Sequence, residues 1–128
     1  MVAALRVLLV EDDADSAATM ARFLRGSGHE VQVSTDGATA LRALETFHPD
    51  AVLLDLGLPD IDGWHVAQQI WKQAGLLRPL LIAVSGYSKE EHGWQSREAG
   101  IDLHLVKPVD LEQLNALLSR HREVLSHP

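Results

Sequence analysis

The feature that most constrains the fold of this chain is a fivefold alternation of short apolar runs with segments of helical periodicity. The runs span 5–10, 30–35, 51–54, 80–84 and 103–106. Three of them, at 5–10, 51–54 and 80–84, are apolar almost throughout, which is typical of parallel strands buried on both faces. The run at 30–35 alternates Val31 and Val33 with polar residues, so we expect it to form an edge strand.

The segments between the runs carry apolar residues at the spacing of an amphipathic helix. These apolar positions are Ala17, Met20, Ala21 and Leu24; Ala38, Leu41, Leu44 and Phe47; Trp64, Ala67, Ile70, Trp71 and Ala74; and Leu111, Leu114, Leu118 and Leu125. The segment 89–99 is the weakest helix candidate, because Trp94 is its only large apolar residue and Gly93 lies inside it. Residues that favour helix boundaries are Gly26, Gly28, Gly75 and Gly100 at the ends, with Asp62 and Asp110 as N-caps.

Strands that alternate with helices at this spacing predict a parallel α/β sheet with helices on both faces. Five such units in 128 residues leave no room for a second domain. We therefore expect a single domain over 1–128 with its core at 5–125.

The composition excludes several functional classes. The chain has 11 Lys and Arg against 18 Asp and Glu, a net charge of −7, which argues against unaided binding to nucleic acid. It has no Cys, and therefore no disulfide and no thiolate metal site. Its longest apolar run, 80–84, is far shorter than the ~20 residues that a bilayer requires, and residues 1–9 lack the pattern of a signal peptide. We expect a cytoplasmic protein that binds no membrane.

Polar side chains follow four of the predicted strands at the point where each strand ends. In chain order they are Glu11, Asp12 and Asp13; Asp55; Ser85; and Lys107 with Pro108. Ligands of an open parallel sheet bind outside the carboxyl ends of its strands, where these residues are expected to meet.

This set of side chains suits a hard cation and a phosphoryl group. Three carboxylates a few ångströms apart repel one another unless a cation joins them, and oxygen ligands without His or Cys favour Mg²⁺ or Mn²⁺ over zinc. Lys107 adds a positive charge and Ser85 a hydrogen-bond donor, which together can neutralise a transferring phosphoryl group. Asp55, the central carboxylate, is the expected nucleophile and would form an acyl phosphate.

Four blocks of the sequence resemble the receiver domain of two-component response regulators. They are VLLVEDD at 7–13, AVLLDLGLPDIDGW at 51–64, IAVSGYS at 82–88 and LVKP at 105–108. The blocks occur in the order and spacing of that family and cover nearly the whole chain. The resemblance implies a three-layer, doubly wound, flavodoxin-like fold, as in CheY, with five parallel strands in the order 2-1-3-4-5.

The resemblance also implies a metal site. Glu11 and Asp12 are the acidic pair that holds Mg²⁺ or Mn²⁺, together with Asp55 and the backbone carbonyl of Gly57. Asp13 follows the pair and is expected to face away and cap the first helix.

The remaining implied roles concern the phosphoryl group. Asp55 accepts it from a phosphohistidine, Ser85 turns toward it as a switch residue, and Lys107 forms an ion pair with it. Residues implied to shape the nearby loops are Pro59, Gly63 and, after a cis peptide bond, Pro108.

Two positions depart from the commonest pattern of the family. The switch aromatic, Phe or Tyr, is replaced by His104, whose ring is smaller and titratable. Gly57, two residues after the phosphoacceptor, has no side chain to shield the phosphoryl group. Tyr87, two residues after Ser85, is expected to compensate in part and to modulate the lifetime of the phosphoryl group.

The implied partners are a histidine kinase or a histidine phosphotransfer protein, and an output protein that is either separate or covalently linked. The fourth helix, fifth strand and fifth helix form the usual signalling face, on which Trp94 is a candidate contact. The chain is expected to be a monomer or a weak dimer that forms through this face. The segments SGYS, LHLVKPVD and LEQLNALL resemble receivers attached to hybrid histidine kinases, although a free-standing receiver or a shortened regulator also fits.

Two other classes of protein share part of this pattern. Phosphatases of the haloacid-dehalogenase type also use an aspartyl nucleophile with Mg²⁺ and Lys, but they need an acid two residues after the nucleophile, where this chain has Gly57. A flavin-binding module of similar architecture needs a loop rich in Ser, Thr and Gly after the first strand, where this chain has EDDAD. The prediction is therefore a phosphoryl-accepting signalling domain rather than an enzyme, with an aspartyl phosphatase as the alternative.

Overall fold

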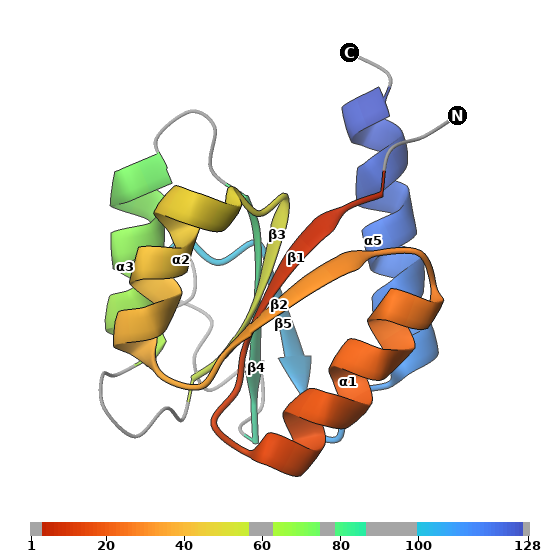
Figure 1. Cartoon of the computed structure of the whole chain (residues 1–128), viewed down its shortest axis with the longest axis horizontal. Helices are drawn as coiled ribbons and strands as arrows, with labels where there is room; N and C mark the ends of the chain where they lie inside the picture. The colour runs from red at the N-terminus through yellow and green to blue at the C-terminus, as the bar shows by residue number, and fades with distance from the viewer. Residues whose placement is uncertain (1–3, 57–62, 75–78, 87–99, 127–128) are drawn as a thin grey trace.

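A computed structural model describes residues 4–56, 63–74, 79–86 and 100–126 of the chain (Figure 1). The strands are β1 (Arg6–Val10), β2 (Glu30–Ser34), β3 (Ala51–Asp55), β4 (Leu80–Ser85) and β5 (Leu103–Val106). They form one sheet in the order β2-β1-β3-β4-β5, and all neighbouring pairs are parallel. The predicted fold class and strand order are confirmed.

The helices in the described part of the chain are α1 (Ala14–Gly26), α2 (Gly37–Phe47), α3 (Gly63–Ala74) and α5 (Leu111–Ser126). The segment 89–99, predicted as the fourth helix, lies outside the described residues. No helix of the described part is long and apolar enough to cross a membrane.

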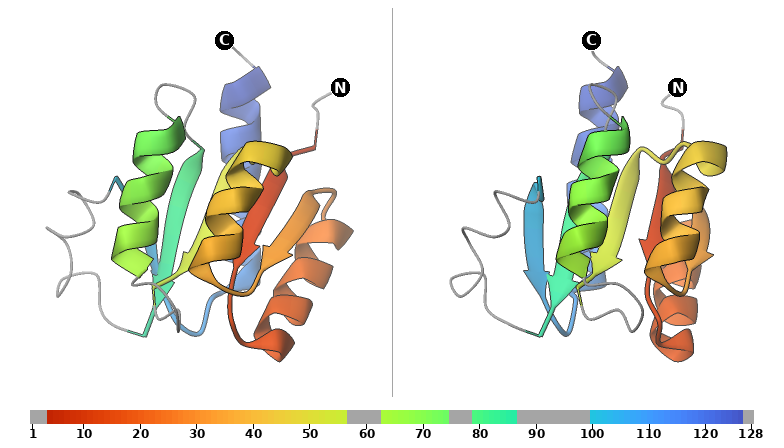
Figure 2. Two further views of the ribbon diagram at one scale, coloured as in Figure 1. Left: turned by 60° about the vertical axis from the view of Figure 1, so that its left-hand side comes forward. Right: turned by 90° about the vertical axis from the view of Figure 1, so that its left-hand side faces the viewer.

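The helices pack on both faces of the sheet, with α1 and α5 on one face and α2 and α3 on the other (Figures 1 and 2). Strand β1 supplies both layers of the core, because successive strand side chains point to opposite faces. Val7 and Leu9 pack with the side chains of α1 and α5, whereas Leu8 and Val10 pack with those of α2 and α3. This two-sided burial is the reason why the run at 5–10 is apolar at every position except Arg6.

The edge position predicted for residues 30–35 is also confirmed. Strand β2 lies at one end of the sheet and pairs only with β1 among the described strands. Its residues Gln32 and Val33 are half-buried, whereas every residue of β3 is buried.

Side chains of aspartates cap the helices that lead away from the strands. Asp13 accepts a hydrogen bond from Ser16 N at 3.0 Å and caps α1, as expected. Asp110 accepts from Gln113 N at 3.2 Å at the start of α5, which confirms the predicted N-cap. Asp36 caps α2 through Thr39 N at 2.8 Å and was not anticipated. Asp62 and Gly75 lie outside the described residues.

Trp71 was expected on the apolar stripe of α3 but is 52% exposed. Among the described side chains of α3, the buried apolar ones are Val66, Ala67 and Ile70. Instead of entering the core, the Trp71 ring covers Gly100, where a Cβ atom would lie 2.5 Å from Trp71 Cδ1. Gly100 also has a φ of +80°, so both its backbone and its neighbour favour glycine.

Candidate functional site

The residues that follow the strands converge at the carboxyl edge of the sheet. Backbone hydrogen bonds continue the ladder past the strand ends and hold these residues side by side. The bonds run from Glu11 N to Ser34 O at 3.0 Å, from Leu56 N to Val84 O at 3.0 Å and from Lys107 N to Ser85 O at 2.8 Å. The side chains of the site are therefore fixed to a rigid sheet rather than to loops alone.

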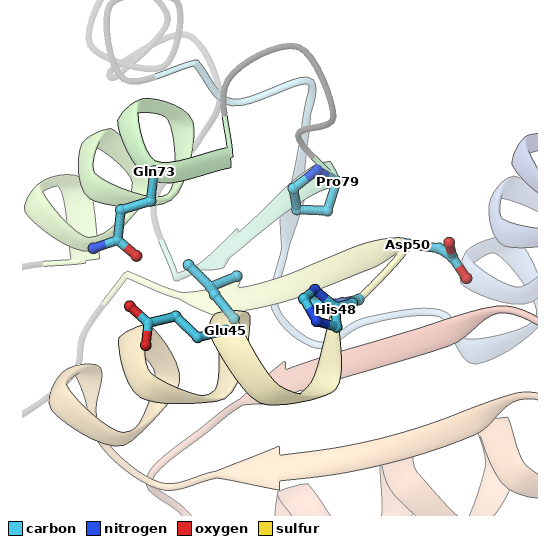
Figure 3. Close-up of a pocket in the computed structure, with 7 residues that line it drawn as sticks. Glu45, His48, Asp50, Gln73 and Pro79 are labelled. Atoms are coloured by element: carbon cyan, nitrogen blue, oxygen red, sulfur yellow. The ribbon is translucent and has the colours of Figure 1, made fainter.

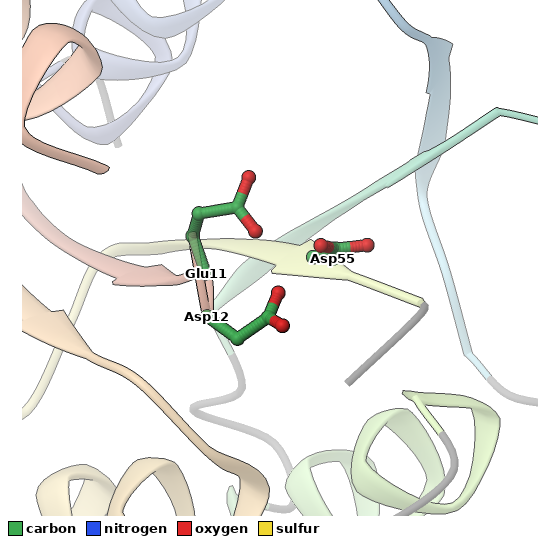
Figure 4. Close-up of side chains that lie close together, drawn as sticks. All are labelled: Glu11, Asp12 and Asp55. Carbon is green, nitrogen blue, oxygen red and sulfur yellow. The ribbon is translucent and has the colours of Figure 1, made fainter. Parts of the chain in front are cut away.

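Three carboxylates meet at this edge. Glu11, Asp12 and Asp55 each place an oxygen atom within 4.8 Å of the others, with Glu11 and Asp12 reaching from the end of β1 toward Asp55 on β3 (Figure 4). Glu11 is 6% exposed and Asp55 is 7% exposed, whereas Asp12 is exposed. Two of the three groups are thus removed from water in the presence of like charge.

The crowding perturbs the ionisation of Glu11. Burial, followed by the hydrogen bond and the negative charge of Asp55, raises the pKa of Glu11 to about 7. The charge of Lys107 and a long hydrogen bond from Asp13 N, at 3.5 Å, act in the opposite direction without cancelling the rise. A carboxyl group that resists ionisation next to another carboxylate indicates a shortage of positive charge at this edge.

Lys107 supplies part of that positive charge. Its Nζ atom donates to Asp55 Oδ2 at 3.2 Å and lies 3.8 Å from Glu11 Oε1. Partial burial lowers the pKa of Lys107, but the hydrogen bond and charge of Asp55, with the charges of Glu11 and Asp12, outweigh it and hold that pKa above its usual value. The ammonium therefore stays charged and points into the acidic cluster.

The donor set fits a hard divalent cation. Glu11, Asp12 and Asp55 offer only carboxylate oxygens, the ligands that Mg²⁺ and Mn²⁺ prefer. Asp13 does not join them, because it is engaged with Ser16 as the cap of α1. Gly57, whose carbonyl was expected to complete the set, lies outside the described residues.

Ser85 and His104 are brought together on neighbouring strands. Ser85 ends β4 and is 4% exposed, and its Oγ atom lies 2.9 Å from His104 Nε2 on β5. Both residues were singled out in the sequence, but the hydrogen bond between them was not anticipated. It follows from the register of β4 and β5, which no sequence motif specifies.

The loops around the site place glycine and proline where the backbone is most restricted. A Cβ atom on Gly63, the first residue of α3, would collide with the backbone of Leu56, the residue after Asp55. Only glycine allows α3 to begin this close to the end of β3.

The Lys107–Pro108 peptide bond is cis, as the resemblance implies. Pro59, Tyr87 and Trp94, which were expected to act here or on the partner face, lie outside the described residues.

Two cavities flank the sheet at opposite edges. A cavity of about 610 Å³ lies next to Glu11 and Lys107, between α1 and the segment that leads into α5. A second cavity, of about 690 Å³, lies at the amino edge, where its lining includes the residues just before β3 and β4 (Figure 3). Its lining includes Glu45, His48, Asp50, Gln73 and Pro79. No sequence motif pointed to it.

Comparison with known proteins agrees with this geometry. The family model of the response regulator receiver domain matches residues 7–119. The chain is 40% identical over 111 residues to the transcriptional regulatory protein PrrA of Mycobacterium tuberculosis. The aligned region covers 87% of this chain and 47% of PrrA.

Solved structures of receiver domains are similar over almost their whole length. The receiver domain of a sensor histidine kinase from Pseudomonas aeruginosa PAO1, with a magnesium ion coordinated in its active site cleft, is 30% identical with a TM-score of 0.83. This match covers 94% of this chain and 99% of that chain. A CheY-like receiver domain from Methylobacillus flagellatus is 32% identical with a TM-score of 0.79, over 93% and 99% of the two chains.

The chain spans about half the length of the curated relatives it matches. These relatives support the receiver interpretation and give no support to the aspartyl phosphatase alternative. The matched region contains β2, β3, β4 and β5 in full, β1 from its second residue onward, and the whole acidic cluster. The chain belongs to the family of response regulator receiver domains, the phosphoryl-accepting signalling domains of two-component systems.

Proposed function

We propose that Asp55 is the phosphoacceptor of this receiver domain and that Glu11, Asp12 and Asp55 hold the Mg²⁺ or Mn²⁺ ion that the reaction needs. The observation that carries the proposal is the meeting of three carboxylates with the Lys107 ammonium, 3.2 Å from Asp55, at the carboxyl edge of the sheet. A structural role alone gives no reason to bury two of these carboxylates side by side.

The residues of this edge have complementary tasks in the proposed transfer. A carboxylate oxygen of Asp55 attacks the phosphorus atom of a phosphohistidine, the bond from phosphorus to the imidazole nitrogen breaks, and an acyl phosphate forms on Asp55. The electron pair of the broken bond remains on the imidazole nitrogen. Lys107 pairs with the incoming phosphoryl oxygens, and the Ser85 hydroxyl donates to one of them. A divalent cation bound to the acidic cluster would supply the remaining neutralisation of their charge.

The acyl phosphate then acts as a signal by shifting the receiver between two conformations that differ in partner affinity. Partners of the proposed kind are a histidine kinase or histidine phosphotransfer protein upstream and an output protein downstream. PrrA of Mycobacterium tuberculosis is a transcriptional regulatory protein about twice the length of the aligned region, which supports a regulatory output. The partner face around Trp94, weak dimerisation through it, the modulating role of Tyr87 and a cytoplasmic location stay predictions.

We also propose that residues 1–128 contain a single receiver domain with its core at 5–125. Every described strand belongs to one sheet, and every described helix packs on it or on a neighbouring helix. Self-phosphorylation from small donors and self-dephosphorylation are the chemistry that such a domain is expected to carry out without being a classical enzyme.

Incubation with a small acyl phosphate and Mg²⁺, followed by intact-mass measurement, tests the proposal. We expect a mass gain of one phosphoryl group that does not form when Mg²⁺ is chelated before the donor is added and that is absent in Asp55→Asn. A gain that persists in Asp55→Asn, or that does not depend on the metal, would overturn the assignment.

A further inference from the structure

The hydrogen bond between Ser85 and His104 depends on the histidine. Ser85 Oγ and His104 Nε2 lie 2.9 Å apart, a distance typical of a well-formed hydrogen bond. Ser85 is only 4% exposed, so this bond is screened from bulk water. A phenylalanine at position 104 has no atom that could replace the imidazole nitrogen.

The register of the sheet explains why these two side chains meet. His104 on β5 pairs with Ala83 on β4, and Ser85 is two residues after Ala83. Side chains two residues apart on a strand point to the same face, so the Ser85 hydroxyl and the imidazole share one face of the sheet. The ring of His104 therefore reaches diagonally from its place opposite Ala83 toward Ser85.

This bond and a phosphoryl group on Asp55 engage Ser85 from opposite sides. Strand β4 lies between β3, which ends in Asp55, and β5, which carries His104. The contact with His104 draws the hydroxyl toward β5, whereas a phosphoryl oxygen on Asp55 would approach from the side of β3. The Ser85 hydroxyl has a single proton, so while it donates that proton to His104 Nε2 it cannot donate to a phosphoryl oxygen.

We propose that His104 is a positioning residue that restrains the Ser85 hydroxyl on the β5 side, so that a phosphoryl group on Asp55 must displace it. The inference rests on the proposed role of Asp55. It adds that phosphorylation of Asp55 must break the hydrogen bond between Ser85 and His104, which opposes the switch. Loss of one hydrogen bond of this kind corresponds to an equilibrium shift of about three- to tenfold. His104 therefore lowers the readiness of the chain to enter the phosphorylated conformation, and release of Ser85 is part of the switch.

Binding of beryllofluoride, a mimic of the phosphoryl group, tests the inference when measured by calorimetry in the presence of Mg²⁺. We expect His104→Phe to tighten binding about three- to tenfold. In a Ser85→Ala background the same substitution is expected to change nothing, because the restrained hydroxyl is already absent. Unchanged or weaker binding in His104→Phe, or equal tightening in the Ser85→Ala background, would overturn the inference.

A second measurement uses the unmodified chain and needs no variant to fold. Heteronuclear NMR of the His104 imidazole nitrogens is expected to show the Nε2 resonance shift when beryllofluoride and Mg²⁺ are added, because the hydrogen bond is lost. An unmoved Nε2 resonance at saturating beryllofluoride would contradict the inference alone. A chain that binds no beryllofluoride would overturn the proposed function and, with it, the role of His104.

Discussion

The two edges of the sheet use the same residue types for different purposes. At the amino edge, Asp50 precedes β3 and accepts a hydrogen bond from Arg6 N at 2.8 Å. Asp102 precedes β5 and accepts from Leu81 N at 2.8 Å. At the carboxyl edge, Asp55 ends β3 among two other carboxylates and the Lys107 ammonium. Strand β3 thus has a different aspartate at each end. Asp50, just before the strand, bonds to the backbone of β1, whereas Asp55, its last residue, is crowded by other carboxylates.

Charges at the amino edge are also neutralised locally. The guanidinium of Arg6 lies over the ring of Phe47, 4.6 Å from its centroid, and its Nε atom lies 3.7 Å from Glu30 Oε2. At the carboxyl edge, Lys107 faces Glu11, Asp12 and Asp55, and the negative charge exceeds the positive. An aspartate that bonds to the backbone contributes to stability, whereas a cluster with excess negative charge is suited to bind a cation and a phosphoryl group.

The largest effect expected within this comparison comes from Lys107. We expect Lys107→Ala to slow phosphoryl acceptance from a small acyl phosphate by about 10²- to 10³-fold, because a charge that stabilises the transferring group is lost. The rate is measured by intact mass over time at saturating Mg²⁺. Lys107→Arg is the matched control, since it keeps the charge, and it should retain more of the rate than Lys107→Ala. Equal rates in Lys107→Ala and the parent chain would remove Lys107 from the mechanism.

A smaller effect is expected from the exposed member of the acidic cluster. Asp12→Asn should weaken Mg²⁺ binding at least about tenfold, which corresponds to ~1.4 kcal/mol, because an anionic ligand becomes neutral. Isothermal titration calorimetry measures the affinity. Asp13→Asn is the matched control, because Asp13 caps α1 and does not face the cluster. If Asp13→Asn weakened Mg²⁺ binding as much as Asp12→Asn, the assignment of the ligands would be wrong.

The smallest effect on phosphoryl acceptance is expected at the amino edge. Asp50→Ala should lower the free energy of unfolding by about 1–3 kcal/mol, because Arg6 N loses its acceptor. Phosphoryl acceptance should stay unchanged once the protein is folded. Urea denaturation and the intact-mass assay measure the two properties, and Asp102→Ala should behave in the same way. A loss of phosphoryl acceptance in a folded Asp50→Ala protein would show that the two edges are not independent.

Much of the fold was predictable because its physical cause is local in sequence. Central strands are buried on both faces and are therefore apolar almost throughout, as at 7–10. The edge strand alternates, as at Val31 and Val33. The order of the strands was not derivable from periodicity, which does not state which strands are neighbours. It came from the resemblance to receiver domains and is confirmed.

The site was predictable to the extent that parallel strands bring their carboxyl ends to one edge. This rule correctly gathered Glu11, Asp12, Asp55 and Lys107. The rule could not assign a role to Asp50, which also borders an apolar run. Asp50 accepts a hydrogen bond from Arg6 N because β1 pairs with β3. The hydrogen bond between Ser85 and His104 was likewise hidden, because it depends on the register of β4 and β5.

The proposed mechanism depends most directly on which residue carries the phosphoryl group. Hydroxylamine converts an acyl phosphate into a stable hydroxamate, so treatment of the phosphorylated chain followed by peptide mass spectrometry identifies the modified residue. We predict a hydroxamate on Asp55 that forms only after incubation with both the phosphodonor and Mg²⁺. A hydroxamate on Glu11 or Asp12, or a phosphoryl group that hydroxylamine does not release, would contradict the account.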